Sequence, residues 1–241
     1  VRGVGPCLIV AFVAYALELA KRQYAAKVIG RLRPPPGTQL AWRGQMFLNN
    51  VSNIPTPPFI TSWRVEQLSN GSFDHRDSDI WVATYPKSGT TWTQTIVASI
   101  WGWPVNSLLE GAQRKYCPWA ERALGGASVP MAEFRARPSP RCLKTHWPAV
   151  GFLAQGTRRG RVVFVMRNAV DVLASWFHHH VDIAMLLDFK QTPDEFFESF
   201  MAGNVSFGSY FEFIASWWPF LRDPDVLFLR YEEMRKSPAE H

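Results

Sequence analysis

The sequence predicts an α/β domain with a central parallel sheet flanked by helices. Three observations lead to this fold class. Short apolar runs recur without strict alternation, as expected of strands that are covered on both faces. Helical patterns separate these runs, and strands that alternate with helices pair in parallel through right-handed crossovers. The chain has 241 residues, 47% of them hydrophobic, which is enough for one substantial core.

The expected elements alternate along the chain. Apolar runs predict strands over residues 79–84, 141–145, 161–166 and 225–229. Helical periodicity predicts helices over residues 90–101, 169–180, 193–202 and 209–218. Helices therefore follow the first and the third strand, as a parallel sheet with crossover connections requires.

Net charge and cysteine spacing limit the kind of partner. The formal charge of +6 suits an anionic partner, but the basic residues are scattered and form no run of like charges, so we expect no nucleic-acid partner. The three cysteines, Cys7, Cys117 and Cys142, are widely spaced and lack C-x-x-C pairing. They predict neither a disulfide framework nor a zinc site, and they favour a reducing compartment.

The N-terminal region is expected to lie outside the main domain. Residues 4–20 are almost wholly apolar but contain Glu18, and they fall short of the about 20 residues that a membrane-spanning helix needs. A membrane anchor, a docking helix and an artefact of an incomplete upstream sequence stay open. Basic residues follow, so even an anchored chain would keep its main domain in the cytoplasm. Pro34 to Gly37 break any helix, and we divide the chain into an extension over residues 1–50 and a domain over residues 51–241.

A stretch similar to a phosphate-binding loop, TYPKSGTTW, covers residues 84–92 between the first strand and its helix. Backbone N–H groups at a helix start, with the helix dipole behind them, form an anion site. Gly89 lets the backbone approach the anion, and Lys87, which here precedes the glycine, supplies a full charge. Three hydroxyl groups can donate hydrogen bonds, those of Ser88, Thr90 and Thr91. Taken alone, the loop could also be an ordinary turn with capping threonines.

Polar side chains also follow the other three predicted strands. Lys144 and His146 end the second strand, and Tyr231 follows the fourth. Arg167 follows the third strand, with Ser175 about two turns into the next helix. An open α/β sheet binds its ligand beyond the carboxyl ends of its strands. One such residue alone is usually structural, but four strand ends together predict a binding site.

These motifs resemble those of the cytosolic sulfotransferases. The resemblance rests on YPKSGTTW, LKTHWP, RNAVDVLAS, FMAGNVSFGS and the strand before Tyr231, in the family's order over about residues 53–241. It implies a cytoplasmic enzyme that transfers a sulfuryl group from 3'-phosphoadenosine 5'-phosphosulfate (PAPS) to a hydroxyl or amine of a small acceptor, with no metal. The sequence leaves the identity of the acceptor open.

The resemblance also implies a role for each site residue. Lys87, Ser88, Gly89, Thr90 and Thr91 would hold the 5'-phosphosulfate, Trp92 would stack near the adenine, Arg167 and Ser175 would bind the 3'-phosphate, and Tyr231 would line the nucleotide site. His146 corresponds to the general base, and Lys144 to a lysine that steadies the sulfuryl group. A histidine with an unperturbed pKa of about 6.5 suits that task at neutral pH. A lysine aimed at the departing oxygen, here Lys87, stabilises the transition state.

The chain departs from the family at its C-terminus. Cytosolic sulfotransferases continue into an R-K-G-x-x-G-D-W segment that closes over the nucleotide and into a dimerisation segment, whereas this sequence stops at His241. We therefore expect a C-terminally truncated, monomeric chain with little activity. A P-loop kinase or NTPase is one alternative, but it needs a lysine after the glycine and a magnesium-binding acid. A non-catalytic nucleotide-binding protein is another, but it leaves Lys144 and His146 without a purpose.

Overall fold

The computed structural model describes residues 49–51, 53–57, 60, 65–66, 68, 73–103, 116–123, 131–149, 160–182, 189 and 191–237. The apolar residues 4–20, the proline-rich linker and Cys7 lie outside these ranges, so the division near residue 50 stays a prediction. Within the described ranges, no helix combines the length and the apolar composition that crossing a membrane requires.

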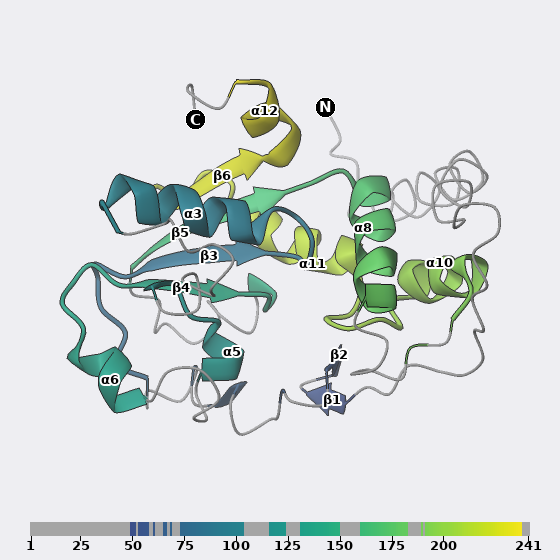
Figure 1. The fold of residues 1–241 in the computed structure, drawn as a ribbon, viewed down its shortest axis with the longest axis horizontal. Coiled ribbons are helices and arrows are strands. Elements are labelled where there is room, and N and C mark those ends of the chain that lie inside the picture. Colours follow the sequence, from purple (N-terminus) through teal and green to yellow (C-terminus); the bar gives the residue numbers. More distant parts are fainter. Residues whose placement is uncertain are drawn as a thin grey trace, which may run out of the picture.

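Four parallel strands form the central sheet (Figure 1). Their order is β4-β3-β5-β6, with bounds Ile80–Thr84 for β3, Cys142–Thr145 for β4, Arg161–Met166 for β5 and Val226–Arg230 for β6. The register pairs Thr84 with Val165 and Met166 with Arg230, so neighbouring strands end close together. The predicted α/β fold is confirmed, and each strand lies within one residue of its predicted bounds.

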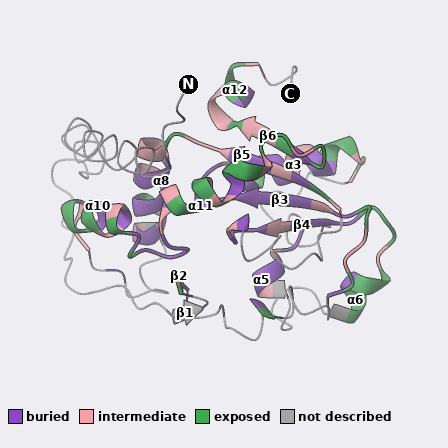
Figure 2. Ribbon diagram, turned by 180° about the vertical axis from the view of Figure 1, so that it is seen from behind, coloured by how far each residue is buried: buried purple, intermediate pink, exposed green. Residues whose placement is uncertain are grey.

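The four predicted helices are present as well. Their bounds are Thr90–Ile100 for α3, Ala169–Asp182 for α8, Pro193–Ala202 for α10 and Tyr210–Trp217 for α11. Helices α3 and α11 cover opposite faces of the sheet, and α8 stands beyond the carboxyl ends of the strands (Figure 1, Figure 2). Local sequence explains their ends. In α10, Thr192 and Glu195 form a capping box, Pro193 opens the helix, and Gly203 ends it with a φ of 76°.

Short elements were not predicted. They are the antiparallel pair β1 (Asn49–Val51) and β2 (Ile54–Thr56), the helices α5 (Ala120–Ala123), α6 (Met131–Ala136) and α12 (Tyr231–Lys236), and the 3₁₀ turn η2 (Trp218–Phe220). Each is six residues or shorter. Such a length covers less than two helical turns, so no hydrophobic period can establish itself in the sequence.

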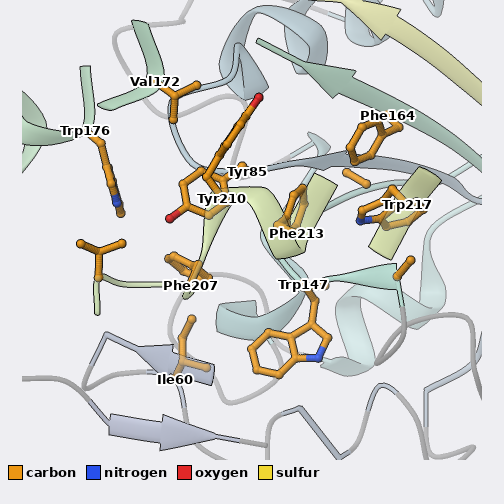
Figure 3. Packing of buried hydrophobic residues seen from close by; sticks show 14 of the residues in the cluster. Ile60, Tyr85, Trp147, Phe164, Val172, Trp176, Phe207, Tyr210, Phe213 and Trp217 are labelled. Carbon is orange, nitrogen blue, oxygen red and sulfur yellow. The ribbon is translucent and has the colours of Figure 1, made fainter. Parts of the chain in front are cut away.

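Aromatic side chains form the core between the sheet and α11. Figure 3 shows Phe164 of β5 beside Phe213 and Trp217 of α11, with ring centroids 5.9 and 5.1 Å from the Phe164 ring. At the opposite, amino ends of β3 and β4, Arg141 Nη2 lies 2.7 Å from Asp79 Oδ2, and both side chains are buried. Breaking a buried ion pair leaves an uncompensated charge, so this pair anchors the amino ends. The carboxyl ends of the strands do not take part in this ion pair, and the candidate site lies beyond them.

The expectation that the cysteines form no disulfide was wrong. Cys117 and Cys142, 25 residues apart in the sequence, form a disulfide with their Cα atoms 4.5 Å apart. The reason is a contact that spacing cannot show: Lys144 N–H donates to the carbonyl of Pro118 at 2.9 Å, and a parallel bridge joins Trp119 to Lys144. Residues 116–123, called the β4 flank below, therefore lie along β4 and bring the two sulfurs together. The argument for a reducing compartment loses its basis.

Candidate active site

A cavity of about 410 Å³ lies beyond the carboxyl ends of the strands. Its described lining residues are Pro86, Lys87, Gly89, Thr90, Thr91, Trp92, Trp119, Lys144, His146, Arg167, Ser175, Trp176, His179, Phe207 and Tyr231. Every site residue predicted from the sequence lines it except Ser88. Residues from four strand ends thus meet in one cavity, as the parallel sheet requires.

The loop before α3 has the geometry of an anion cradle. Gly89 has a φ of 102°, and a Cβ atom there would come within 2.7 Å of the Tyr231 ring, so only glycine fits. Lys87 also adopts a left-handed backbone, with a φ of 68°, and such a conformation is uncommon for a residue with a side chain. Helix α3 begins at Thr90, immediately after this turn. The loop therefore directs the start of a helix, and its unpaired N–H groups, at the cavity.

Arg167 lies against this loop. Its Nη1 donates to the carbonyl of Lys87 at 2.9 Å, and its guanidinium carbon lies 4.5 Å from the centre of the Tyr231 ring. Tyr231 also meets Trp92, with ring centroids 5.5 Å apart. Among the described residues, the buried Nε of Arg167 has no hydrogen-bond partner, and neither does the buried hydroxyl of Ser88. Arg167 lines the cavity, so its orphaned Nε is a donor that a bound anion could satisfy.

His146 is held in one tautomer. Its Nδ1 lies 2.8 Å from the carbonyl oxygen of Thr84. A carbonyl only accepts, so Nδ1 carries the proton and Nε2 is the basic nitrogen. The rings of Trp119 and Phe207 lie beside the imidazole, with centroids 5.1 and 5.2 Å from it and 5.8 Å from each other. Burial, together with the neighbouring Lys144 and His179, lowers the pKa of His146 to about 3. The imidazole is therefore neutral in the isolated chain at pH 7.

Positive charge dominates the cavity. Lys87, Lys144 and Arg167 line it, and no acidic residue appears among its described lining residues. Lys144 Nζ lies 4.5 Å from the centre of the Trp119 ring, which directs the charge along the aromatic wall. Converging like charges repel one another, and an anion in the cavity offsets that repulsion. The arrangement fits a ligand with several negative charges.

Five lining residues were not predicted as site residues: Pro86, Trp119, Trp176, His179 and Phe207. Trp119 and Phe207 come from segments without a helical or strand pattern, and their positions depend on contacts with β4 and β2. Phe207 has a φ of 72°, and its N–H donates to the carbonyl of Pro55 at 2.6 Å. Left-handed residues with large side chains gather at functional sites. In the sequence, only the glycine that follows Phe207 hints at this turn.

The rings of the His178–His180 run diverge, as expected from consecutive positions on a helix. His178 is exposed, His179 lines the cavity, and His180 is buried with its Nδ1 2.8 Å from the carbonyl of Trp176. Burial lowers the pKa of His180 to about 4. The run therefore contributes one residue to the site and one to the core.

Two further cavities hold none of the predicted site residues. One of about 420 Å³ is lined by Trp101, Trp103 and Tyr116 at the amino end of β4. The other, of about 490 Å³, lies between β2 and the start of α11 and shares only Phe207 with the cationic cavity. Volume does not separate the three, so the converging cations and the oriented histidine identify the candidate site.

Comparison with known proteins identifies the family of the chain. Residues 77–241 match the sulfotransferase domain family. The chain is 36% identical to mouse sulfotransferase 1 family member D1 over 69% of its own length, and 35% identical to dog sulfotransferase 1B1 over 78%. It spans 57% and 64% of those two relatives.

Solved structures show the same fold. A mouse sulfotransferase complexed with PAP superposes with a TM-score of 0.63 at 25% identity, covering 80% of this chain and 65% of that one. A retinol dehydratase complexed with androsterone and PAP has the same TM-score at 23% identity, and the superposition covers 82% of this chain and 66% of the dehydratase chain. The family match extends over more than half of the chain, and so this protein belongs to the sulfotransferase family.

Proposed function

We propose that this chain carries the active site of a PAPS-dependent sulfotransferase, which acts on a hydroxyl or amine of a small acceptor with His146 as the general base. One observation carries the proposal: the basic Nε2 of an oriented histidine shares a cavity with two lysines and a glycine-containing anion loop. A phosphoryl-transfer enzyme would need a magnesium-binding acid beside the loop, and the described lining residues include no acid.

The residues present fit PAPS. The start of α3 and Lys87 suit the phosphosulfate, and Arg167, with its orphaned Nε, suits the second phosphate together with Ser175. Trp92 and Tyr231 supply an aromatic surface on which the adenine of the nucleotide can pack. PAPS, when bound, supplies the sulfuryl group. A mouse relative at 25% identity was solved with PAP, which supports the same nucleotide class here.

His146 must gain basicity before it can act. With a pKa of about 3 it takes a proton poorly at pH 7, because burial and the charge of Lys144 both oppose protonation. An anion beside Lys144 offsets that charge. We therefore infer that nucleotide binding raises the pKa of His146, so that the base becomes effective only in the loaded site. Nε2 then removes the proton of the acceptor while the Thr84 carbonyl holds Nδ1–H in place.

The two lysines divide the remaining work. Lys87 stands in the loop at the start of α3, where charge develops on the oxygen that leaves the sulfur. Lys144 also lines the cavity, two residues before His146, where it steadies the group in transfer. Trp119 and Phe207 contact each other as well as the imidazole, and they form an aromatic wall beside His146 that suits an apolar ring bearing the acceptor hydroxyl or amine.

The substitution His146→Ala tests the proposal. Losing a general base typically costs about 10²- to 10⁴-fold in rate, whereas calorimetry should show unchanged PAP affinity, because the imidazole serves the acceptor. His178→Ala, exposed on α8 and outside the cavity lining, is the matched control. Transfer from labelled PAPS is measured against a panel of phenols, alcohols and amines. Wild-type turnover by His146→Ala would refute the assignment of His146 as the general base. Turnover of ATP with Mg²⁺, but not of PAPS, would favour the kinase alternative.

A further inference from the structure

A buried carboxylate lies behind the catalytic histidine without touching the imidazole. Glu121 of α5 is fully buried, and its Oε1 accepts hydrogen bonds from the hydroxyl of Thr145 and from the backbone N–H of His146, the latter at 3.0 Å. The Thr145 hydroxyl oxygen in turn accepts from the N–H of Trp147 at 3.0 Å. One carboxylate oxygen therefore organises three consecutive residues at the end of β4.

A carboxylate in this position needs a reason. Burying a charged group is costly, and burial raises the pKa of Glu121 while its hydrogen bonds and the charge of Lys144 oppose that rise. An apolar side chain of similar size would fill the space at less cost. The hydrogen bonds that Glu121 Oε1 accepts from other residues go to the strand end that carries the proposed base, so fixing that strand end is what the carboxylate contributes.

The same strand end is fixed from several sides. The β4 flank holds the backbone of Lys144 through the Pro118 carbonyl, and the Cys117–Cys142 disulfide ties the flank to the start of β4. On the other side, the Thr84 carbonyl holds Nδ1 of His146. Glu121 completes this frame, because it fixes the backbone of His146 and Thr84 fixes its ring. Catalysis is sensitive to such placement, and a shift of about 1 Å can cost about 10²-fold in rate.

We propose that Glu121 is a positioning residue, which holds Thr145 and His146 so that Nε2 of the imidazole points into the cavity. This inference rests on the proposed function, since it presumes that His146 is the base. The carboxylate contacts a backbone N–H and a hydroxyl, not the reacting groups, so its effect comes from the geometry of the two hydrogen bonds that it accepts.

Three variants separate geometry from charge. Glu121→Leu removes both accepted hydrogen bonds and should lower kcat about 10²-fold, with PAP affinity within about two-fold of wild type because the loop at residues 84–92 is untouched. Glu121→Gln keeps an oxygen acceptor and should restore most of kcat. Thr145→Val removes the hydroxyl alone and should lower kcat in the same direction, which keeps the test valid if Glu121→Leu does not fold. Glu198→Leu, on the exposed side of α10, is the control.

The deciding readout does not depend on turnover. In the ¹⁵N NMR spectrum of the wild-type chain, His146 should show one neutral tautomer with the proton on Nδ1. Glu121→Leu and Thr145→Val should lose this signature through exchange between tautomers, and Glu121→Gln should keep it. If the folded Leu and Val variants keep both the single tautomer and wild-type kcat, Glu121 has no positioning role. If only the base assignment is wrong, His146→Ala will keep its rate while the tautomer of the Glu121 variants still changes.

Discussion

The cavity has two halves that are held in place by different means. The loop half consists of residues 84–92 with Arg167 and Tyr231, and its shape comes from a glycine turn between a strand and the helix that follows it directly. The histidine half consists of the end of β4 with the β4 flank and Phe207. It is held by contacts between distant segments, namely the Cys117–Cys142 disulfide, the Glu121–Thr145–His146 hydrogen bonds and the Phe207–His146 ring contact.

Because of this difference, we expect substitutions in the two halves to have different effects. In the loop half, a side chain can be removed while the turn persists, because backbone geometry creates the anion site. In the histidine half, side chains hold one another, so removing one disturbs the placement of several. Variants of the loop half should therefore change binding or rate at constant stability. Variants of the histidine half should change orientation, stability and pH response together.

The largest effect in the loop half is expected from Lys87→Met. Removing one preorganised charge or donor that stabilises a transition state typically costs about 10²- to 10³-fold in kcat, while PAP should still bind, since Arg167 and the helix start remain. Rates with labelled PAPS and calorimetry with PAP measure the two quantities on the same preparation. Lys236→Met, exposed at the end of α12, is the control. A loss of PAP affinity as large as the loss of rate would show that Lys87 serves ground-state binding.

A smaller effect, on binding alone, is expected from Arg167→Ala. Hydrogen bonds to charged groups contribute about 1.5 to 3 kcal/mol each, so PAP affinity should fall roughly 10- to 150-fold. Because PAP lacks the sulfuryl group, this loss reports on phosphate binding. Arg161→Ala, at the exposed opposite end of the same strand, should leave affinity unchanged. Equal affinity in the two variants would remove Arg167 from the phosphate site.

The two halves also differ in how far the sequence predicts them. The loop half was predicted because its signals are local: a strand, a glycine turn and a helix start follow one another in nine residues, and a parallel sheet gathers its strand ends at one edge. The main helices were predicted from their periodicity, which is also local, and caps such as Thr192 and Gly203 lie at the ends of α10. The histidine half was predicted only in Lys144 and His146. Glu121, Trp119 and the cysteine pair were missed, because their roles depend on the β4 flank lying along β4, which no periodicity encodes.

The smallest expected effect is the loss of unfolding free energy as the pH falls. It should come from the buried histidines and not from the loop half. Burial lowers the pKa of His146 to about 3 and of His180 to about 4, both below the value of about 6.5 expected in the unfolded chain. The unfolded chain therefore binds more protons below pH 6.5. Stability from each histidine is fully present above that pH and is lost progressively as the pH falls toward 4.

The substitution His180→Leu isolates one of these contributions. Between pH 7 and 5.5 the wild type should lose about 1 kcal/mol of unfolding free energy more than this variant. The comparison of pH slopes is needed because the variant also changes packing, and because Glu121, whose pKa burial raises, acts in the opposite sense. Denaturant unfolding at several pH values measures the slopes, with His178→Ala as the exposed control. A slope in His180→Leu equal to that of the wild type would mean that His180 accepts a proton in the folded chain, and the acid response would then have to come from the histidine half alone.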